Sequence, residues 1–245
     1  MKTLSSLLLL LIATLTSTTP GIVVAEGIPE DVAVKIETAD FPGLLDTFVG
    51  HFTLTTDTVV RKPKKAGRQE VKIVVDVTRS PNGIVDRRLV LVLKDGEDVT
   101  EKRRKKVEKE LAKADKVDDE YHGEDDVVTP FGKSAGWYDV GTPRFDGNTV
   151  TLDFEPNAEY ADEEGVVRGR VAWNLQTRDP LWIEMTAVTP PKLMKELSLR
   201  TEYARSGDLL YVNQLSTKGI ITVLFFTREF VMDQHVSDLT VTPEE

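Results

Sequence analysis

Three histidines are the first candidates for catalysis or metal binding, because an imidazole can act as a general base or as a metal ligand. His51, His122 and His235 lie far apart, and none has a second histidine or a carboxylate at metal-ligand spacing on a helix. We also expect no nucleophile elbow of the G-x-S-x-G type. The sequence therefore predicts no metal, no cofactor, no catalytic residue and a protein that is not an enzyme.

Clusters of acidic side chains offer the oxygen ligands that calcium prefers. They lack the alternating aspartates and central glycine of a calcium loop, so solvated loop charge is the favoured interpretation. A glycosidase needs two carboxylates across a cleft, at a distance that a sequence does not show, and a hydrolase therefore stays a third, minor hypothesis. The clusters are Asp118-Asp119-Glu120, Glu124-Asp125-Asp126 and Asp162-Glu163-Glu164.

A basic segment, residues 101–116, carries eight basic and four acidic side chains. Asp98 followed by Glu101 indicates a helix start, and we expect the helix to run to about Ala114, ahead of an acidic loop over 117–135. Its apolar stripe is thin. A transient contact with an anionic membrane surface is one interpretation, and a helix that only keeps its outer face in water is the favoured one.

Apolar and aromatic residues supply the remaining signal, because the segments 166–176, 181–189 and 220–232 place them on both faces of a strand. Most are expected to be ordinary core. An open, curved sheet nevertheless has more concave surface than one helix can cover, which predicts a hollow that holds a lipid or another apolar ligand. The residues expected to line it are Phe48, Phe52, Leu54, Trp173, Leu175, Ile183 and Met185.

The elements that position these residues are mostly strands. Apolar runs recur between Gly, Pro, Asn and Asp, and in 48–55 and 71–77 the apolar residues alternate with polar ones. Pro81-Asn82-Gly83 is a plausible hairpin turn before the strand 84–94. We predict a mostly β fold: a strongly curved antiparallel sheet or incomplete β-barrel of about ten strands, with one charged helix inserted after the third.

The N-terminus is typical of an exported protein. Lys2, the apolar stretch Leu7–Leu15 and the small residues ending at Ala25 predict a cleavable signal peptide over 1–25. A retained anchor is disfavoured, since the apolar stretch of roughly ten residues is shorter than the ~20 that cross a bilayer. Residues 26–46 carry no clear pattern, and 47–245 are expected to form a single domain without cysteines.

The order of these parts resembles the LolA/LolB-like superfamily of periplasmic lipoprotein-carrier and outer-membrane lipoprotein-sorting-like proteins. The resemblance rests on the export signal, the charged helix, and three strand segments. It implies an incomplete β-barrel closed by helices over an apolar cavity that receives lipid chains. The strand segments are Arg88-Leu89-Val90-Leu91-Val92-Leu93-Lys94-Asp95-Gly96, Gly169-Arg170-Val171-Ala172-Trp173 and Pro180-Leu181-Trp182-Ile183-Glu184.

These observations predict a periplasmic or secreted, non-enzymatic protein that binds a lipid, a lipoprotein acyl chain or another apolar ligand. The alternative is an envelope interaction or scaffold module whose hollow is filled by its own side chains. The formal net charge of −10 argues against nucleic acid as a partner. No stretch after the signal is long and apolar enough to predict a transmembrane helix, and no cysteine is present for lipidation.

Overall fold

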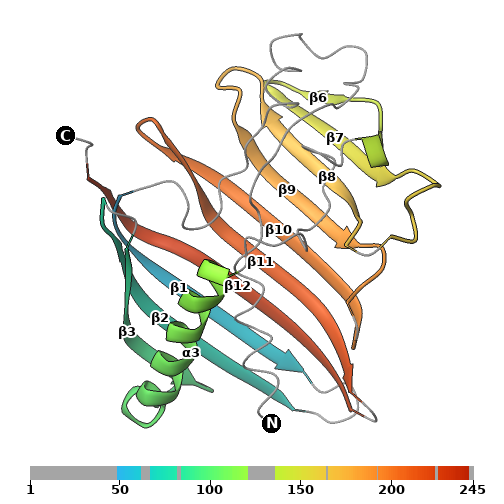
Figure 1. Ribbon diagram of the computed structural model, residues 1–245. Coiled ribbons are helices and arrows are strands. Elements are labelled where there is room, and N and C mark those ends of the chain that lie inside the picture. Colours follow the sequence, from blue (N-terminus) through green and yellow to red (C-terminus); the bar gives the residue numbers. More distant parts are fainter. Residues whose placement is uncertain are drawn as a thin grey trace.

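Twelve strands of the protein join into one antiparallel sheet (Figure 1). The strands are β1 Gly50–Arg61, β2 Arg68–Arg79, β3 Val85–Lys94, β4 Glu97–Asp98, β5 Tyr138–Val140, β6 Arg144–Asp146, β7 Thr149–Pro156, β8 Val167–Asn174, β9 Pro180–Ala187, β10 Met194–Ser206, β11 Leu209–Val223 and β12 Phe226–Val241. Their spatial order is β4-β3-β2-β1-β12-β11-β10-β9-β8-β7-β5, with β6 paired to β7. The sheet ends at β4 on one side and at β5 and β6 on the other, so it is open.

This computed structural model describes residues 49–61, 67–81, 84–120, 136–163, 165–191, 193–223 and 226–242. The expected signal segment 1–25, the segment 26–46 and Phe48 lie outside the described residues. His122 and residues 121–135 of the expected acidic loop lie outside them as well.

Alternation of side chains explains why these segments form strands. In β7, Val150, Leu152 and Phe154 are buried, while Thr149 and Asp153 on the other face are only partly covered. A period of two is the pattern of a strand with one face against a core. The mostly β, curved antiparallel sheet expected from the sequence is confirmed.

The first and last described strands lie side by side in the middle of the sheet. β1 pairs with β12 from Gly50↔Val241 to Arg61↔Glu229, with one register shift near His51. The chain therefore runs outward from β1 to β4, crosses to the far edge, and returns strand by strand to β12. The pairing of β1 with β12 therefore joins the two halves of the sheet, and we call this pairing the seam.

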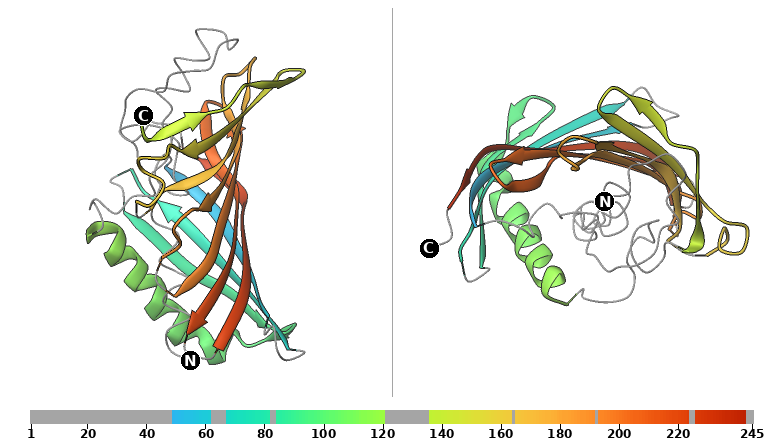
Figure 2. Two further views of the ribbon diagram at one scale, coloured as in Figure 1. Left: turned by 90° about the vertical axis from the view of Figure 1, so that its right-hand side faces the viewer. Right: turned by 90° about the horizontal axis from the view of Figure 1, so that it is seen from above.

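The sheet is strongly curved, with α3 (Thr100–Glu120) on its concave side (Figure 2). Register shifts contribute to this curvature, because an extra residue in one strand bends it and increases its twist. Such shifts occur beside Val75 in β2, Trp173 in β8 and Tyr203 in β10, among other places. Each lies next to residues of the concave face.

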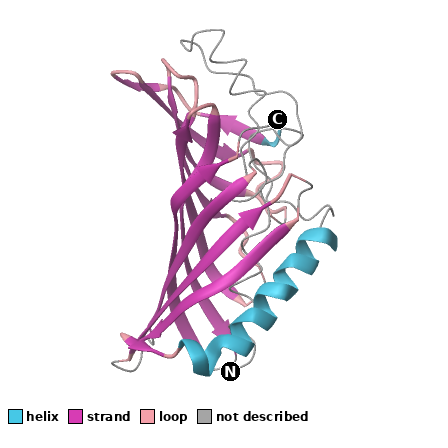
Figure 3. Cartoon of the chain, turned by 90° about the vertical axis from the view of Figure 1, so that its left-hand side faces the viewer, coloured by secondary structure: helices cyan, strands magenta, loops and turns pink. Residues whose placement is uncertain are grey.

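Helix α3 starts where the sequence indicates. The Asp98 carboxylate accepts hydrogen bonds from the Thr100 backbone N–H and hydroxyl, at 2.8 and 2.6 Å. This satisfies a donor of the first turn. The helix packs on β3 and lies on one side of the sheet (Figure 3).

Two details differ from expectation. The helix passes Ala114 and ends at Glu120, inside the segment expected to be a loop; Lys, Asp and Glu do not break a helix, and the first glycine or proline comes only at Gly123. The short strand β4 also stands between β3 and the helix. Asp95 and Gly96 both have positive φ, at 52° and 85°, which makes the tight hairpin that turns the chain back onto β3.

Candidate functional site

The concave face of the sheet can be followed as rows of directly paired residues, which point to the same side. One row runs from Leu152 through Val171, Ile183, Thr201, Leu215 and Gln234 to Thr56, Ile73 and Val92. The next runs from Phe154 through Gly169, Met185, Leu199, Thr217 and Met232 to Thr58, Val71 and Lys94. These rows define the surface on which a ligand site would be built.

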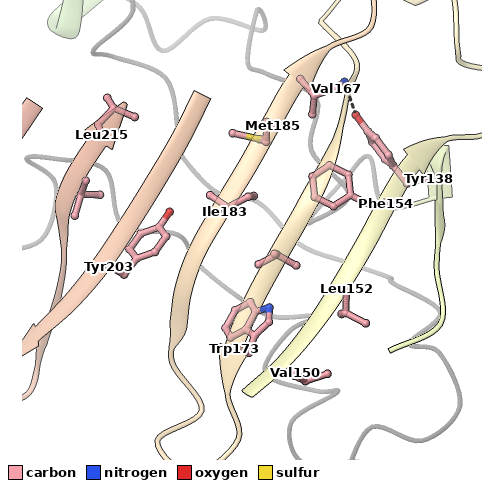
Figure 4. Close-up of a cluster of buried hydrophobic side chains, with 12 residues drawn as sticks. Tyr138, Val150, Leu152, Phe154, Val167, Trp173, Ile183, Met185, Tyr203 and Leu215 are labelled. Atoms are coloured by element: carbon pink, nitrogen blue, oxygen red, sulfur yellow. Dashed lines mark hydrogen bonds between the residues drawn. The ribbon is translucent and has the colours of Figure 1, made fainter. Parts of the chain in front are cut away.

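Apolar side chains fill one end of this face (Figure 4), and we call them the β7–β11 cluster. They are each at most 8% exposed. Tyr138 packs edge-on against Phe154, with ring centroids 5.9 Å apart. The cluster consists of Tyr138, Val150, Leu152, Phe154, Val167, Val171, Trp173, Ile183, Met185, Tyr203, Val212 and Leu215, and Leu175 and Leu199 are among the partly buried residues that pack against it.

A second group, the helix-side cluster, fills the other end. It contains the buried residues Phe52, Val75, Val77, Leu89, Val92 and Val236. Val107 and Leu111 of α3 pack against it, together with Leu54 and other partly buried residues. The thin apolar stripe expected on the helix is therefore used here.

The residues expected to line one hollow are divided between these two groups. Phe52 and Leu54 belong to the helix-side cluster, whereas Trp173, Leu175, Ile183 and Met185 belong to the β7–β11 cluster or pack against it. Phe48 lies outside the described residues. The structure thus brings four of the seven together, and their role in binding stays a prediction.

Between the two clusters the concave face carries several polar side chains, which the sequence did not predict. We call Thr201, Thr217, Gln234, Thr56 and Thr58 the polar belt; they come from β10, β11, β12 and β1. Thr201 is 1% exposed, and Thr217 and Gln234 are 0% exposed. Gln234 Nε2 donates to Thr56 Oγ1 at 3.3 Å. Thr201, Thr217 and Gln234 each interrupt the apolar residues of their own strand face, beside Leu199, Leu215 and Met232, but the sequence alone does not show which face points inward.

Three atoms of the belt have no hydrogen-bond partner: Thr201 Oγ1, Thr217 Oγ1 and Gln234 Oε1. Most buried polar side-chain atoms in proteins are hydrogen-bonded, so unpaired ones require an explanation. In this protein, three unpaired polar atoms lie on adjacent strands and on the same face of the sheet.

Charge is concentrated on the opposite, convex face. Arg170 donates to Glu184 at 2.9 Å, and Arg200 reaches the same carboxylate oxygen at 3.4 Å. Both guanidinium groups also lie near the ring of Trp182, at 5.8 and 4.7 Å from its centroid. At the far edge, hydrogen bonds from Arg144 lower the pKa of Asp153. The two rows described above contain one charged residue, Lys94, at their β3 end.

Burial makes the tyrosines of the β7–β11 cluster harder to ionise. Burial raises the pKa of Tyr138 to about 12, although its hydroxyl oxygen accepts a hydrogen bond from the Val167 N–H at 3.2 Å. Burial also raises the pKa of Tyr203 well above its usual range. Neither phenol is therefore prepared to act as a base or nucleophile at neutral pH.

No metal or catalytic grouping emerges among the residues that the structure describes. His51 Nδ1 lies 3.3 Å from the Thr78 hydroxyl, and His235 is exposed. No three His, Cys, Asp or Glu side chains in the described ranges come together as metal ligands. Asp162 and Glu163 are exposed loop residues.

The expectation that the sequence contains no G-x-S-x-G pattern is wrong. Gly132-Lys133-Ser134-Ala135-Gly136 has the letters of the G-x-S-x-G pattern, and only its last residue lies within the described ranges. A nucleophile elbow joins a strand to a following helix. Here Gly136 is followed by a single turn at Trp137 and then by strand β5, so the described context does not match.

Lys102, Lys105, Lys106 and Lys109 of the basic helix are exposed, whereas Arg104 is partly buried and forms hydrogen bonds. Arg104 bonds Glu101 at 2.9 Å and lies 3.6 Å from Glu108, and it donates to the Leu89 carbonyl at 3.3 Å. In the part of the chain described here, no helix combines the length and apolar character needed to span a membrane.

Comparisons with known proteins give the chain no family. No protein-family model and no curated protein matches it. It is similar to a structure of the Pseudomonas aeruginosa MucA/MucB complex, with 11% identity, a TM-score of 0.21, and coverage of 80% of this chain and 94% of that one. It is likewise similar to MucB in complex with MucA(peri), at 11% identity, TM-score 0.18 and 79% and 94% coverage. At these values neither similarity bears on function.

Proposed function

We propose that this protein binds a lipid, a lipoprotein acyl chain or another apolar ligand on the concave face of its sheet, without catalysing a reaction. The observation that carries the proposal is the β7–β11 cluster, a continuous group of apolar side chains on the concave face of six strands. The α-helix that the structure describes packs on β3, near the opposite edge of the sheet. Sites for apolar ligands are lined mostly by apolar and aromatic side chains of this kind.

Export supports the same proposal. The pattern of residues 1–25 favours a cleavable signal peptide, and the chain contains no cysteine that would be lipidated or oxidised outside the cell. The resemblance of the strand segments and charged helix to the LolA/LolB-like superfamily adds a periplasmic setting. In that setting the ligand class fits lipoprotein sorting or outer-membrane biogenesis.

The basic helix supplies a second contact in this proposal. Lys102, Lys105, Lys106 and Lys109 are exposed and can meet anionic lipid headgroups, each adding about 1 kcal/mol near such a surface. Arg104 does not contribute to this contact, because it pairs with Glu101 on the helix and donates a hydrogen bond to the Leu89 carbonyl of β3. The contact would bring the protein transiently to a membrane.

The alternative is a scaffold or interaction module whose concave face is filled by the protein itself. One observation favours it: each residue of the β7–β11 cluster is already at most 8% exposed. A filled core of this kind needs no ligand. The two functions make opposite predictions about ligand uptake.

Tryptophan quenching distinguishes them. The chain has three tryptophans, of which Trp173 lies in the β7–β11 cluster and Trp182 on the convex face. Trp137→Phe/Trp182→Phe leaves Trp173 as the only reporter, and Trp137→Phe/Trp173→Phe leaves Trp182 as the matched control. Both are titrated with a brominated fatty acyl chain, whose bromine quenches indole fluorescence on contact.

We expect saturable quenching of Trp173 and none of Trp182. Native mass spectrometry of the wild type after incubation with cell lipid should show the corresponding bound mass. A ligand-free mass together with unquenched Trp173 in a folded protein would establish the filled scaffold instead.

A further inference from the structure

The polar belt is the part of the concave face that an acyl-chain site does not explain. Cross-strand pairing places Thr201 and Gln234 in one row, separated by Leu215, and Thr217 in the adjacent row. Thr217 is therefore diagonal to both, at a spacing of about 7–8 Å that a ligand head group can span. The belt sits between the β7–β11 cluster and the helix-side cluster.

The three unpartnered atoms are costly where they stand. Thr201 Oγ1, Thr217 Oγ1 and Gln234 Oε1 are shielded from water and have no hydrogen-bond partner. A polar group that is buried without a partner loses its hydrogen bonds to water and gains none within the protein. Valine or methionine would fill the same volumes without this cost, so the polar atoms are explained best by a partner that arrives from outside.

The chemistry of these atoms restricts that partner. An amide oxygen such as Gln234 Oε1 only accepts hydrogen bonds, whereas a threonine hydroxyl both donates and accepts. A matching ligand group must therefore offer at least one O–H or N–H. The two rows contain no cation except Lys94, four strands away from Thr217 on the sheet path, so the ligand group that meets the belt within these rows is expected to be neutral.

We infer that the concave face takes a neutral amphiphile, whose apolar chain lies on the β7–β11 cluster and whose head group forms hydrogen bonds with the belt through a hydroxyl or amide donor. The inference rests on the proposed function and names its ligand class. Long-chain alcohols, monoacylglycerols and fatty amides have the required combination. Their esters and hydrocarbons share the chain but lack the donor.

Three probes with the same chain length test this. Monopalmitoylglycerol carries hydroxyl donors, methyl palmitate has acceptors only, and hexadecane is the chain alone. We expect the wild type to bind monopalmitoylglycerol about tenfold more tightly than methyl palmitate, the size of one or two buried hydrogen bonds. Dissociation constants are measured by Trp173 fluorescence in the single-tryptophan protein.

Isosteric variants assign the preference to the belt. Gln234→Met and Thr217→Val should each reduce the preference for monopalmitoylglycerol over methyl palmitate several-fold, without weakening the binding of hexadecane, which forms no hydrogen bonds. Thr55→Val is the matched control, because Thr55 lies on β1 with its side chain on the opposite face from Thr56. Circular dichroism establishes that each variant is folded.

The outcomes separate the two levels of the proposal. Equal wild-type affinities for monopalmitoylglycerol and methyl palmitate would overturn the inference and leave acyl-chain binding standing. Failure of the folded wild type to bind any of the three probes, hexadecane included, would overturn the proposed function and the inference with it. Tighter binding of free palmitate at alkaline pH would show that the belt selects an anion, which also contradicts the inference.

Discussion

At the scale of single residues, the polar belt makes a prediction about stability that needs no ligand. Thr217→Val replaces an unpaired, fully buried hydroxyl by a methyl group of similar size. We expect the free energy of unfolding to rise by about 1 kcal/mol, because the variant no longer buries an unsatisfied polar atom. Urea unfolding measures it, with Thr55→Val as the control.

A loss of stability in Thr217→Val would mean that the hydroxyl is satisfied in the native protein. A gain in stability combined with weaker binding of a hydroxyl-bearing ligand is the pattern expected when function retains a costly residue.

Gly169 provides a second test at this scale. It lies on the concave face between Phe154 and Met185, and a Cβ built there would lie 1.9 Å from the Glu184 carbonyl oxygen and 3.0 Å from the Phe154 ring. Gly169→Ala should therefore lower the free energy of unfolding by about 1–3 kcal/mol. Gly141→Ala is the control, since its nearest atoms would lie at 3.6 Å. Equal stabilities of the two variants in urea would contradict this packing.

At the scale of elements, the edge strand β6 is tied to β7 by an ion pair. Arg144 donates two hydrogen bonds to the Asp153 carboxylate, one of them at 2.8 Å, and these lower the Asp153 pKa from its ordinary value of 3.8. A carboxyl with a lowered folded-state pKa stabilises the protein above its unfolded pKa, and this stabilisation is lost as pH falls through the folded value.

Asp153→Asn should therefore lower the free energy of unfolding at pH 7, by no more than about 1 kcal/mol for a pair this exposed. The difference from the wild type should shrink as the pH falls below about 4. Asp146→Asn, on β6 but outside any ion pair of the described residues, is the control. A difference that stayed constant from pH 7 to acid conditions would exclude the pair as its cause.

Helix α3 makes the prediction that concerns membranes. Lys105 and Lys106 are exposed, whereas Arg104 holds the helix to β3. Lys105→Glu/Lys106→Glu should abolish sedimentation with anionic vesicles at low salt and leave the unfolding midpoint nearly unchanged, because solvated charges contribute little to stability. Wild-type protein that does not sediment with anionic vesicles would rule the contact out.

At the scale of the whole molecule, the local sequence pattern predicts the strands and the helix better than it predicts the candidate site. The alternation of Val150, Leu152 and Phe154 and the acceptor at Asp98 predict a strand and a helix start, because both are set by neighbours in sequence. The pairing of β1 with β12 is non-local and leaves no such trace. That pairing decides which residues face each other.

The candidate site depends on those non-local contacts. Phe52 and Trp173 have the same apolar character in the sequence, yet they fall in different clusters. Thr217 and Gln234 look like ordinary exposed strand residues until the sheet order places them on its inner face. The composition of the strands therefore predicts an apolar face. The polar belt at its centre can be identified only once the pairing of the strands is known.

The seam between β1 and β12 carries the last prediction, that residues 47–245 fold as one domain. β12 pairs with β1 on one side and β11 on the other, and it supplies Phe230, Met232 and Val236 to the buried side. A chain ending at Val223 lacks β12, so the edges of β1 and β11 stay unpaired. The two apolar clusters then no longer belong to one sheet. We expect it to lose cooperative unfolding and to aggregate, whereas a chain ending at Thr242 should unfold like the full protein. A truncated chain that kept a sharp thermal transition would show that β1–β4 with α3, or β5–β11, folds independently, and the single-domain prediction would be wrong.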